Sequence, residues 1–497
     1  MAMAVVSPKN SSSDASDLSA HAERSLLDQT FDPEAFRALG HRWVDALAEY
    51  LASARDRKIP VLPWQAPRDM LAEWPAEFPA RDGGDPDTLL ARVIATSNHL
   101  HHPRYFGHQC ATTLPLAALC ELLGGILNNG SIYEMGPGAM AMERAVSGWL
   151  TRQLGFGAGA EAIFTSGGSL GNLTGLLAAQ ASRAGHVWKD GQHAGPPLAV
   201  LVSSHAHYSI SRAVCILGWG EGGAVDVPVD TAFRMRPDEL EPALARARQA
   251  GRRVIAVVAT AGSVPTGAYD PLPAIADFCA KHELWLHVDG AHGAAAALSP
   301  HHRHLVDGIE RADSVVWDAH KMLLMPSLLT AVVFRDSASS YDSFAQDAQY
   351  LLNSPTPWAD SCQRTFECTK DTMVLKLYVA LAHFGPALFS EYVHRMFSLA
   401  ATFAKLIAES PDFELAVPPA CNIVMFRYVP PGATDLDELQ AWIRERLRND
   451  GSFYLVRASL DSHLYLRTCM MNPLSTENDL RALMDAVRRA VADRPGR

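Results

Sequence analysis

Short apolar runs alternate with longer amphipathic stretches through the middle of the chain, from about residue 115 to residue 380. The runs rich in Val, Ile, Leu and Ala are residues 160–168, 198–207, 253–262, 284–290, 314–320 and 328–334. Continuous apolar runs of this length are typical of strands that are covered on both faces. Their alternation with helical stretches predicts an α/β fold built around a mostly parallel sheet.

The two flanks of this region have different patterns. Residues 31–57 carry apolar side chains at helical spacing, and a Pro-rich connector follows at 58–69. After residue 380, helical patterns near 389–410 and 476–493 bracket strand patterns at 422–429 and 463–471. We therefore expect a disordered tail at 1–30, a helical arm at 31–114, a large domain at 115–380 and an α+β domain at 381–497. The arm cannot bury its apolar stripe alone, so it should pack on the main body or on a second subunit.

Polar side chains stand where the predicted strands of the large domain end. They are Ser166, His207, Thr260, Asp289 and His320. In open α/β sheets, ligands bind beyond the carboxyl ends of the strands. These residues therefore predict a ligand site at one edge of the sheet.

Asp289 and Lys321 suggest the chemistry of that site. One strand ends on Asp289, and another is followed directly by His320 and Lys321. A lysine amine can form a Schiff base with the aldehyde of pyridoxal 5'-phosphate, and a carboxylate can hold the pyridine nitrogen protonated. Taken singly, Lys321 is an ordinary solvated lysine and Asp289 a turn residue; the pair in this context favours a pyridoxal phosphate site.

Two further segments fit this interpretation, although each has an ordinary alternative. Residues 165–176 form a Gly-Ser turn between a strand and a helix, where backbone N–H groups and Ser169 would cradle a phosphate. Such turns are also common without a ligand. His207 could stack on a cofactor ring, or it could be a hydrogen-bonded structural histidine.

The composition narrows the class of protein. The 497 residues are 48% hydrophobic and carry a formal net charge of −11, which argues against nucleic acid or an anionic membrane as the main partner. No apolar run is long enough to span a bilayer, and the N-terminus has no signal-peptide pattern. The 8 cysteines include no CxxC pair. We expect a cytoplasmic protein with reduced thiols.

Metal and serine chemistry fit the sequence poorly. His282 and His287 are five positions apart in a segment with a strand pattern, unlike the four of a zinc-protease helix. The His-rich stretches 101–108 and 301–304 have no acidic or cysteine partners at ligand spacing. No GxSxG motif is present. We therefore expect no metal site and no nucleophilic serine.

The ordered motifs of the chain, from about Phe36 to Val491, resemble the group II pyridoxal-phosphate-dependent amino-acid decarboxylases. This family includes aromatic-amino-acid, glutamate, cysteine-sulfinate and L-2,4-diaminobutyrate decarboxylases. The motifs are HPRYFG (102–107), TSGGS (165–169), HVDGAHG (287–293), the HK pair at 320–321, ECTKDTMVLKLY (367–378) and LRTCMMNP (466–473). The resemblance implies pyridoxal phosphate fold type I, with a mostly parallel seven-stranded sheet, and a homodimer.

The resemblance also implies a role for each matched residue. Lys321 would form the Schiff base, Asp289 would pair with the pyridine nitrogen, and His207 would stack on the ring. The remaining cofactor contacts would be Gly168, Ser169, Thr260, Ala291 and His320. Tyr350, about thirty residues beyond the lysine, matches the loop tyrosine that donates a proton to Cα in this family. Relatives that make aldehydes often carry phenylalanine there, so Tyr350 favours simple decarboxylation.

Three positions depart from the usual family pattern. Asp318 stands where many relatives have asparagine, Gly290 where many have alanine, and His292 where an aromatic residue is usual. An acidic residue beside a phosphate is unfavourable unless it is turned away or protonated. The role of Asp318 is therefore open.

The substrate is less well defined than the reaction. His108 and Cys110 match positions that contact the substrate side chain in glutamate-type relatives, and Arg467 could pair with a substrate carboxylate. The expected function is decarboxylation of an L-amino acid to the amine and carbon dioxide. The same fold could also host an aldehyde synthase or an aminotransferase, and a catalytically inactive interaction protein is a remote alternative.

Overall fold

The computed structural model describes residues 25–74, 77–78, 83–130, 132–344 and 359–494 of the chain. The chain divides into two compact units. The smaller holds residues 1–53 and 75–96, and the larger holds residues 54–74 and 97–497. The expected tail lies almost wholly outside the described residues. Parts of the expected arm, 54–74 and 97–114, belong to the larger unit, because they hydrogen-bond to the C-terminal region, as in Val61 N–H to Gly451 O (2.7 Å).

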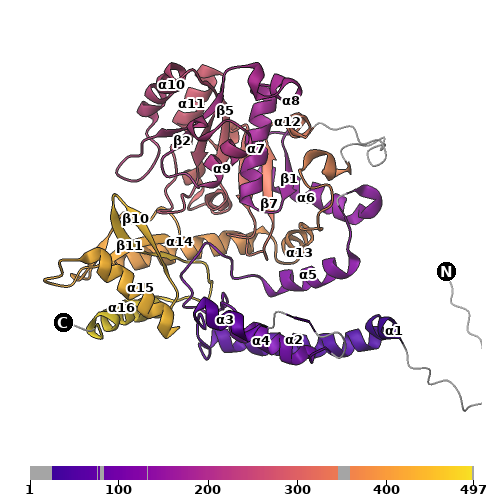
Figure 1. Cartoon of the computed structure of the whole chain (residues 1–497), viewed down its shortest axis with the longest axis vertical. Coiled ribbons are helices and arrows are strands. Elements are labelled where there is room, and N and C mark those ends of the chain that lie inside the picture. The colour runs from indigo at the N-terminus through magenta and orange to yellow at the C-terminus, as the bar shows by residue number, and fades with distance from the viewer. Residues whose placement is uncertain (1–24, 75–76, 79–82, 131, 345–358, 495–497) are drawn as a thin grey trace, which may run out of the picture. The chain divides into compact units, whose positions relative to one another are not determined.

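Figure 1 shows the helices and strands of the structure. The helices are α1 (Leu26–Thr30), α2 (Pro33–Arg55), α3 (Pro67–Glu73), α4 (Pro86–Thr96), α5 (Pro115–Leu127), α6 (Pro137–Gln153), α7 (Gly168–Arg183), α8 (His186–Asp190), α9 (Ser209–Ile216), α10 (Leu240–Gln249), α11 (Leu272–His282), α12 (Ala338–Ser343), α13 (Leu375–Phe384), α14 (Pro386–Ala408), α15 (Leu436–Asp450) and α16 (Glu477–Ala492). The strands are β1 (Glu161–Thr165), β2 (Leu198–Ser203), β3 (Ala224–Val227), β4 (Arg253–Thr260), β5 (Trp285–Asp289), β6 (Ser314–Asp318), β7 (Thr330–Phe334), β8 (Phe413–Leu415), β9 (Ile423–Tyr428), β10 (Val456–Leu460) and β11 (His463–Cys469).

A seven-stranded sheet forms the centre of the larger unit, in the order β1-β7-β6-β5-β4-β2-β3. Strands β3, β2, β4, β5 and β6 are parallel, whereas β7 runs antiparallel to both β6 and β1. The prediction of a mostly parallel α/β sheet is confirmed. Edge strand β3 was not predicted, because its four residues, AVDV, are short and partly exposed.

Helices cover both faces of this sheet. Helices α7, α8 and α9 pack on one face with alternate strand residues such as Val200 and Val258. Helices α6, α10 and α11 lie over the other face, which receives Leu201 and Val257. Because side chains alternate along a strand, both faces of β2 and β4 are apolar, and the strands read as continuous hydrophobic runs.

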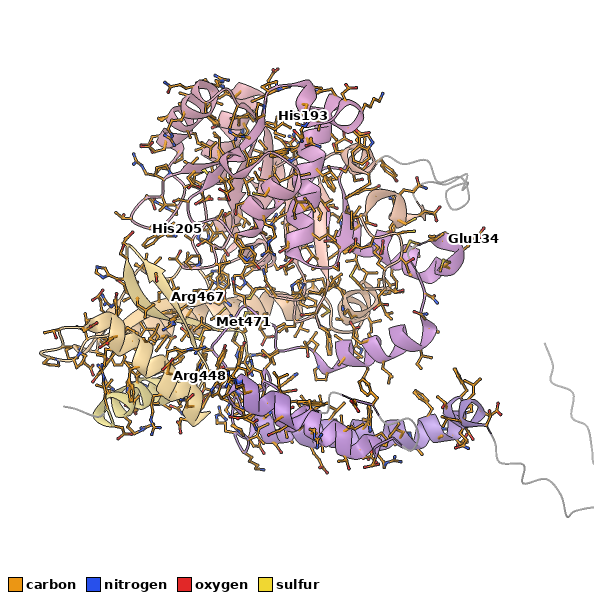
Figure 2. All side chains as sticks on the ribbon, in the orientation of Figure 1. Glu134, His193, His205, Arg448, Arg467 and Met471 are labelled. Carbon is orange, nitrogen blue, oxygen red and sulfur yellow. The ribbon has the colours of Figure 1, made fainter. Side chains whose placement is uncertain are left out.

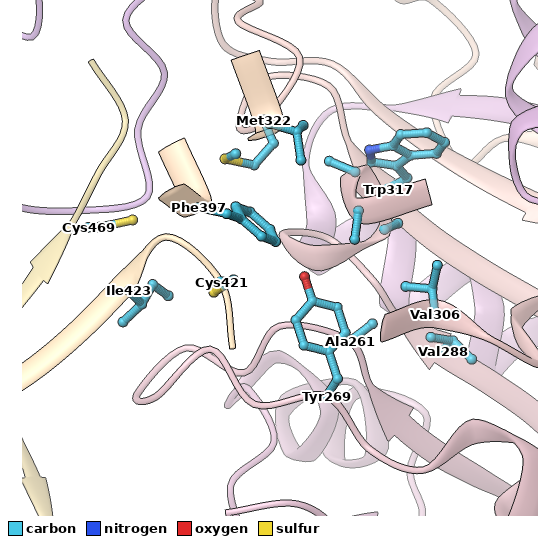
Figure 3. Packing of buried hydrophobic residues seen from close by; sticks show 14 of the residues in the cluster. Ala261, Tyr269, Val288, Val306, Trp317, Met322, Phe397, Cys421, Ile423 and Cys469 are labelled. Atoms are coloured by element: carbon cyan, nitrogen blue, oxygen red, sulfur yellow. The ribbon is translucent and has the colours of Figure 1, made fainter. Parts of the chain in front are cut away.

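The hydrophobic core continues from the large sheet into the C-terminal region (Figure 3). The smaller sheet there has the order β10-β11-β9-β8, and all its pairs are antiparallel. Tyr269 donates from its hydroxyl to the carbonyl of Gly293 at 3.2 Å. Gly267 has φ +76°, and a Cβ there would lie 2.3 Å from Cys421 Sγ. Only glycine permits both that backbone and this close packing.

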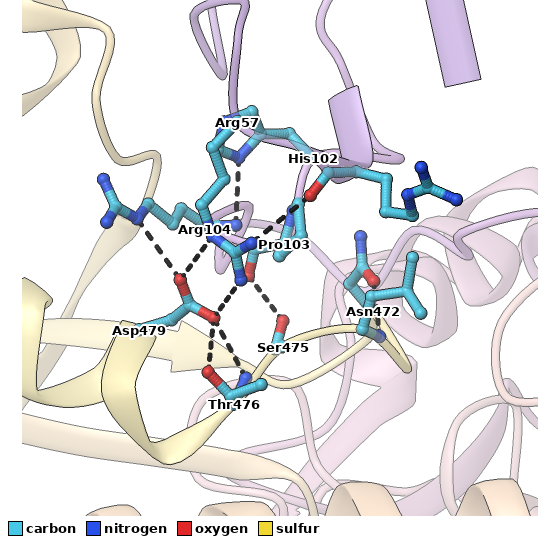
Figure 4. Close-up of polar contacts among 10 residues, drawn as sticks. Arg57, His102, Pro103, Arg104, Asn472, Ser475, Thr476 and Asp479 are labelled. Atoms are coloured by element: carbon cyan, nitrogen blue, oxygen red, sulfur yellow. Dashed lines mark hydrogen bonds and ion pairs between the residues drawn. The ribbon is translucent and has the colours of Figure 1, made fainter. Parts of the chain in front are cut away.

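A buried carboxylate ties the segment around residues 57 and 104 to the last helix (Figure 4). Asp479 accepts from Arg57 Nε and Nη2 at 2.9 and 2.7 Å, and from Arg104 Nε at 3.3 Å. Thr476 completes a capping box with Asp479 at the start of α16. Burial raises the pKa of Asp479, but the hydrogen bonds from Arg57 and Thr476 outweigh burial and leave it below its usual value. The ion pair therefore holds the loop that begins at residue 101.

The smaller unit contains α1 and α4 and most of α2. Arg42 Nε and Trp43 Nε1 both donate to the Asp87 carboxylate, at 2.7 and 3.1 Å. This pairing joins α2 to α4 within the unit.

Three features of the described residues bear on the class of protein. No helix among them is long and apolar enough to cross a membrane. Within the same residues, no group of three or more His, Cys, Asp or Glu side chains has a geometry that could hold a metal ion. All eight cysteines are free thiols.

Candidate active site

A cavity of about 310 Å³ lies beyond the carboxyl ends of β4, β5 and β6. It is lined by Gln109, Ser166, Gly167, Gly168, Ser169, Asn172, His207, Thr260, Gly262, Val264, Asp289, Ala291, His292, Asp318, His320, Lys321 and Leu328. The eight residues expected to hold a cofactor are all in this lining. Residues that are distant in sequence therefore meet at the edge of the sheet that the strand pattern indicated.

Asp289 ends the buried strand β5 and is held from behind by Asn172 of α7. Asn172 Nδ2 donates to Asp289 Oδ2 at 3.0 Å, and the backbone N–H of Ala291 donates to Oδ1 at 3.2 Å. Asn172 Oδ1 lies 3.0 Å from His287 Nε2, and His287 Nδ1 lies 2.7 Å from Ser314 Oγ. Burial lowers the pKa of His287 to about 4, so the ring is neutral and Nε2 donates to Asn172. The orientation of the Asp289 carboxylate is therefore fixed by a satisfied, buried polar network.

The same asparagine determines the tautomer of His207. Asn172 Nδ2 donates to Ser209 Oγ at 2.9 Å, and Ser209 Oγ lies 2.8 Å from His207 Nδ1. The backbone N–H of Ser209 also points at Nδ1, at 3.3 Å. Since Nδ1 accepts both bonds, the ring proton of neutral His207 is on Nε2. Burial lowers the pKa of His207, against the attraction of Asp289.

Lys321 lies in the cavity lining and pairs with Asp318. The Nζ atom of Lys321 lies 2.8 Å from Asp318 Oδ2. Burial lowers the pKa of Lys321, but the charge of Asp318 and the hydrogen bond to it outweigh burial and raise that pKa. Burial likewise raises the pKa of Asp318, and the charges of Lys321 and His320 outweigh it and lower that pKa. These two residues therefore form an ammonium–carboxylate pair.

The Gly-Ser turn leads directly into α7, as expected. Gly167 precedes the helix with φ +115°, and α7 begins at Gly168. A Cβ on Gly168 would lie 2.9 Å from Asp318 Oδ2, so glycine is the residue that fits at the start of this helix. Ser166 is engaged on the outer side, where its hydroxyl donates to Glu367 Oε1 at 2.6 Å. Gly168, Ser169 and the free N–H groups of the first helical turn remain for a phosphate.

His292 departs from the aromatic residue usual at its position, and it is fully buried. Its Nε2 lies 2.7 Å from Asn422 Oδ1, and the amide of Asn422 donates to Met470 O at 2.8 Å. Burial lowers the pKa of His292 to about 3, and the positive charge of Lys321 acts in the same direction. His292 is therefore a neutral donor to Asn422.

The three expected substrate contacts do not line this cavity. His108 is exposed, and its Nε2 lies 3.2 Å from the Tyr454 hydroxyl. Cys110 is also exposed. Arg467 on β11 is 4% exposed and donates from Nε to the Pro265 carbonyl at 3.2 Å (Figure 2). Its Nη2 is buried with no hydrogen-bond partner among the described residues. Tyr350 lies outside the described residues.

A second cavity, of about 740 Å³, lies at the opposite edge of the sheet. It is lined by arginines such as Arg183 and Arg253 and contains no lysine. A Schiff base needs an amine, so the chemistry points to the smaller cavity.

Comparison with known proteins decides the family. Residues 67–429 match the family described as the pyridoxal-dependent decarboxylase conserved domain. The chain belongs to this family. It is a pyridoxal-phosphate-dependent decarboxylase, a carboxy-lyase of fold type I.

Relatives of this decarboxylase differ in the substrates that they are named for. An acidic amino acid decarboxylase of Homo sapiens is 28% identical over 461 residues, covering 89% of this chain and 88% of the relative. An L-2,4-diaminobutyrate decarboxylase of Rhizobium meliloti is 32% identical over 391 residues, covering 78% of this chain and 77% of the relative. The crystal structure of mouse CSAD in apo form superposes with a TM-score of 0.87 at 28% identity, covering 92% of this chain and 99% of that one.

The residues of the decarboxylase fit its cofactor. The cradle at Gly168 would be filled by a Cβ, and the hydroxyl of Thr260 is buried in the lining with no partner among the described residues. Lys321 and the carboxylate of Asp289 line the same cavity. An amine, an acceptor for a ring N–H, and a phosphate cradle are the groups that pyridoxal phosphate requires.

Three residues of the site were not predicted from the sequence. Asn172 and Ser209 link Asp289 to His207 through hydrogen bonds. Glu367 accepts a hydrogen bond from the hydroxyl of Ser166. Asn172 does carry a signal, because it is a polar residue among the small and apolar residues of a helix that follows a glycine turn. The sequence does not show which strand end it faces.

Proposed function

We propose that this decarboxylase removes the α-carboxylate of an L-amino acid as carbon dioxide, with its cofactor held at Lys321. The observation that carries the proposal is the single cavity that joins Lys321, the Asp289 carboxylate held by Asn172, and the cradle at Gly168. Bound pyridoxal phosphate supplies an aldehyde for the amino group and a protonated ring that withdraws electrons from Cα.

The residues of the chain have separate tasks in this proposal. Asp289 would accept the N–H of the ring nitrogen, because the hydrogen bonds from Asn172 and the Ala291 N–H fix the orientation of its carboxylate in the cavity lining. His207, with its proton on Nε2, would stack on the ring, and Ala291 would pack against the ring from the other side. Thr260, whose hydroxyl lines the cavity, would bond the ring hydroxyl. Gly168, Ser169 and His320 would hold the phosphate.

A proton must reach the substrate Cα once carbon dioxide has left. We assign this donation to Tyr350, on the basis of its position in the sequence. Donation to Cα gives the amine, whereas its failure opens the way to aldehyde formation. Water-excluding closure over the site would protect this step.

The side chain of the substrate is proposed to meet His108, Cys110 and Arg467. Arg467 is the strongest of these, because the Nη2 of its buried guanidinium has no hydrogen-bond partner within the described part of the chain and could pair with a carboxylate or sulfinate. The relatives named for acidic amino acids support this class, and the diaminobutyrate relative supports a cationic one. A panel that includes both classes distinguishes them.

We further propose that the decarboxylase acts as a cytoplasmic homodimer, without nucleic acid or membrane partners. Helix α5 supports dimerisation, because one face of it is apolar and exposed among the described residues. That face consists of Leu119, Leu122, Leu123, Ile126 and Leu127, which are 47–63% exposed. Exposed apolar patches of this kind mark interaction surfaces. Sedimentation should give a dimer, and the double variant Leu122→Glu/Ile126→Glu should give a monomer; a wild-type monomer with full activity would refute the dimer.

The test of function is a panel of L-amino acids incubated with the holoenzyme. Carbon dioxide, amine, ammonia and peroxide are measured together, and Lys321→Ala is the blank. Equal amounts of carbon dioxide and amine from one substrate are expected. Ammonia with peroxide would show an aldehyde synthase, and a requirement for a keto acid would show an aminotransferase.

A further inference from the structure

We propose that Asp318 couples cofactor binding to proton uptake, so that the decarboxylase binds the phosphate of its cofactor together with one proton on this carboxylate. The inference rests on pyridoxal phosphate binding at Lys321. It assigns to Asp318 a role as a positioning residue whose charge tunes cofactor affinity.

The geometry places the carboxylate against the phosphate cradle. Asp318 is 2% exposed and lines the cavity. Its Oδ2 would be 2.9 Å from a Cβ on Gly168, where α7 begins. Its Oδ1 accepts from the Thr330 hydroxyl at 2.5 Å. Oδ1 would be 3.0 Å from the same Cβ, so both oxygens border the cradle. Oδ1 accepts from Thr330, and Oδ2 is the oxygen that remains to take a proton.

Lys321 is the cation that balances the charge on Oδ2, since burial lowers the pKa of the neighbouring His320. Lys321 Nζ lies at 2.8 Å and His320 Nε2 at 3.5 Å. His207 and His292 also feel the charge of Asp318, and Asp289 is the other carboxylate of the cavity. Thr330 is the uncharged contact from β7. Lys321 is the only one of these groups that forms a close ion pair with Asp318.

Cofactor binding removes this balance in two ways. Bound phosphate would bring a second anion to the start of α7, beside Asp318. Condensation of the Lys321 amine with the cofactor aldehyde, with loss of one water, would take the ammonium away from Oδ2. A buried carboxylate that loses its cation and gains an anionic neighbour binds a proton more tightly. A proton taken from solvent onto Oδ2 converts the repulsion into an O–H donor for a phosphate oxygen.

The experiment measures affinity rather than activity. Cofactor-free protein is titrated with pyridoxal phosphate between pH 6.5 and 8.5, following absorbance, for the wild type and for Asp318→Asn. For each unit by which the pH rises, the dissociation constant of the wild type is expected to increase by about tenfold more than that of Asp318→Asn. This difference corresponds to one linked proton. Calorimetry in buffers of different ionisation enthalpy should show about one more proton taken up by the wild type.

Three controls make the result specific. Pyridoxal, which lacks the phosphate, should show no such difference between wild type and Asp318→Asn. His320→Asn should keep the extra proton if Asp318 holds it, and should lose it if His320 does. Asp313→Asn changes a carboxylate at the other end of the same strand, where it pairs with Arg335, and should behave as the wild type does.

The outcomes separate this inference from the proposed function. Equal pH dependence in wild type and Asp318→Asn, or an extra proton lost in His320→Asn, would overturn the role of Asp318 while cofactor binding stands. Absence of cofactor binding in every protein, with native circular dichroism, would overturn both. If Asp318→Asn binds pyridoxal with the affinity of the wild type, the variant is folded at the site.

Discussion

Asn172→Ala should weaken the hold on Asp289 and so lower both stability and cofactor affinity. Asn172 is 1% exposed and bonds Asp289, Ser209 and His287 at 2.9–3.0 Å. A hydrogen bond to a charged group contributes about 1.5–3 kcal/mol, and each neutral one about 1 kcal/mol. The variant should therefore lose about 3–5 kcal/mol of unfolding free energy. Asp289 keeps only the bond from the Ala291 N–H, so pyridoxal phosphate should bind about 10- to 100-fold more weakly.

The assays are urea unfolding of the cofactor-free protein and titration with pyridoxal phosphate. Ser209→Ala is the matched control, because it removes the branch to His207 and leaves the bond from Asn172 to Asp289. It should bind the cofactor nearly as the wild type does, and it should change the kinetics with substrate. Asn172→Ala with cofactor affinity within twofold of wild type would refute the reasoning that Asn172 fixes the Asp289 carboxylate.

Three other changes test separate parts of the structure. Gly168→Ala should weaken pyridoxal phosphate at least tenfold in the same titration, because its Cβ would lie 2.9 Å from Asp318 Oδ2; unchanged affinity would mean that the cradle lies elsewhere. The His287 pKa of about 4 means that the unfolded chain binds a proton below pH 6.5 that the folded protein does not, so stability falls as pH drops from 6.5 to 4. In urea unfolding, the free energy of unfolding of His287→Gln should fall by about 3 kcal/mol less than that of the wild type over this pH range. Equal pH dependence of the two proteins would contradict this reasoning. Asp479→Ala should lose about 3 kcal/mol of stability by leaving Arg57 without its buried partner, and addition of Arg57→Gln should then cost little more.

The strands of the large sheet could be predicted because they are buried on both faces. Strand β4 is buried at every position after Arg253, and such a run leaves few alternatives. The hydrophobic pattern of a strand does not depend on the direction in which it runs. The antiparallel orientation of β7 therefore could not be predicted from the sequence. Strand β3 was missed because its burial is mixed, and a short edge strand has no periodicity to detect.

The candidate site could be predicted where residues stand at strand ends. Asp289 and Lys321 have fixed places relative to apolar runs, so topology alone brings them to one edge. The contact of Asn172 with Asp289 could not be predicted, because the two are 117 positions apart and depend on how α7 crosses the sheet. The pairing of Ser166 with Glu367 could not be predicted for the same reason, because the two residues are 201 positions apart. The boundaries expected for the domains stay a prediction.

The central claim is that Lys321 carries the cofactor of this decarboxylase. The most direct measurement is borohydride reduction of the holoenzyme, followed by digestion and mass spectrometry of the pyridoxyl-labelled peptide. The label is expected on Lys321 alone, and Lys321→Ala should carry none. A label on Lys370 or Lys376, which are buried elsewhere in the same unit, or a label retained in Lys321→Ala, would contradict the account.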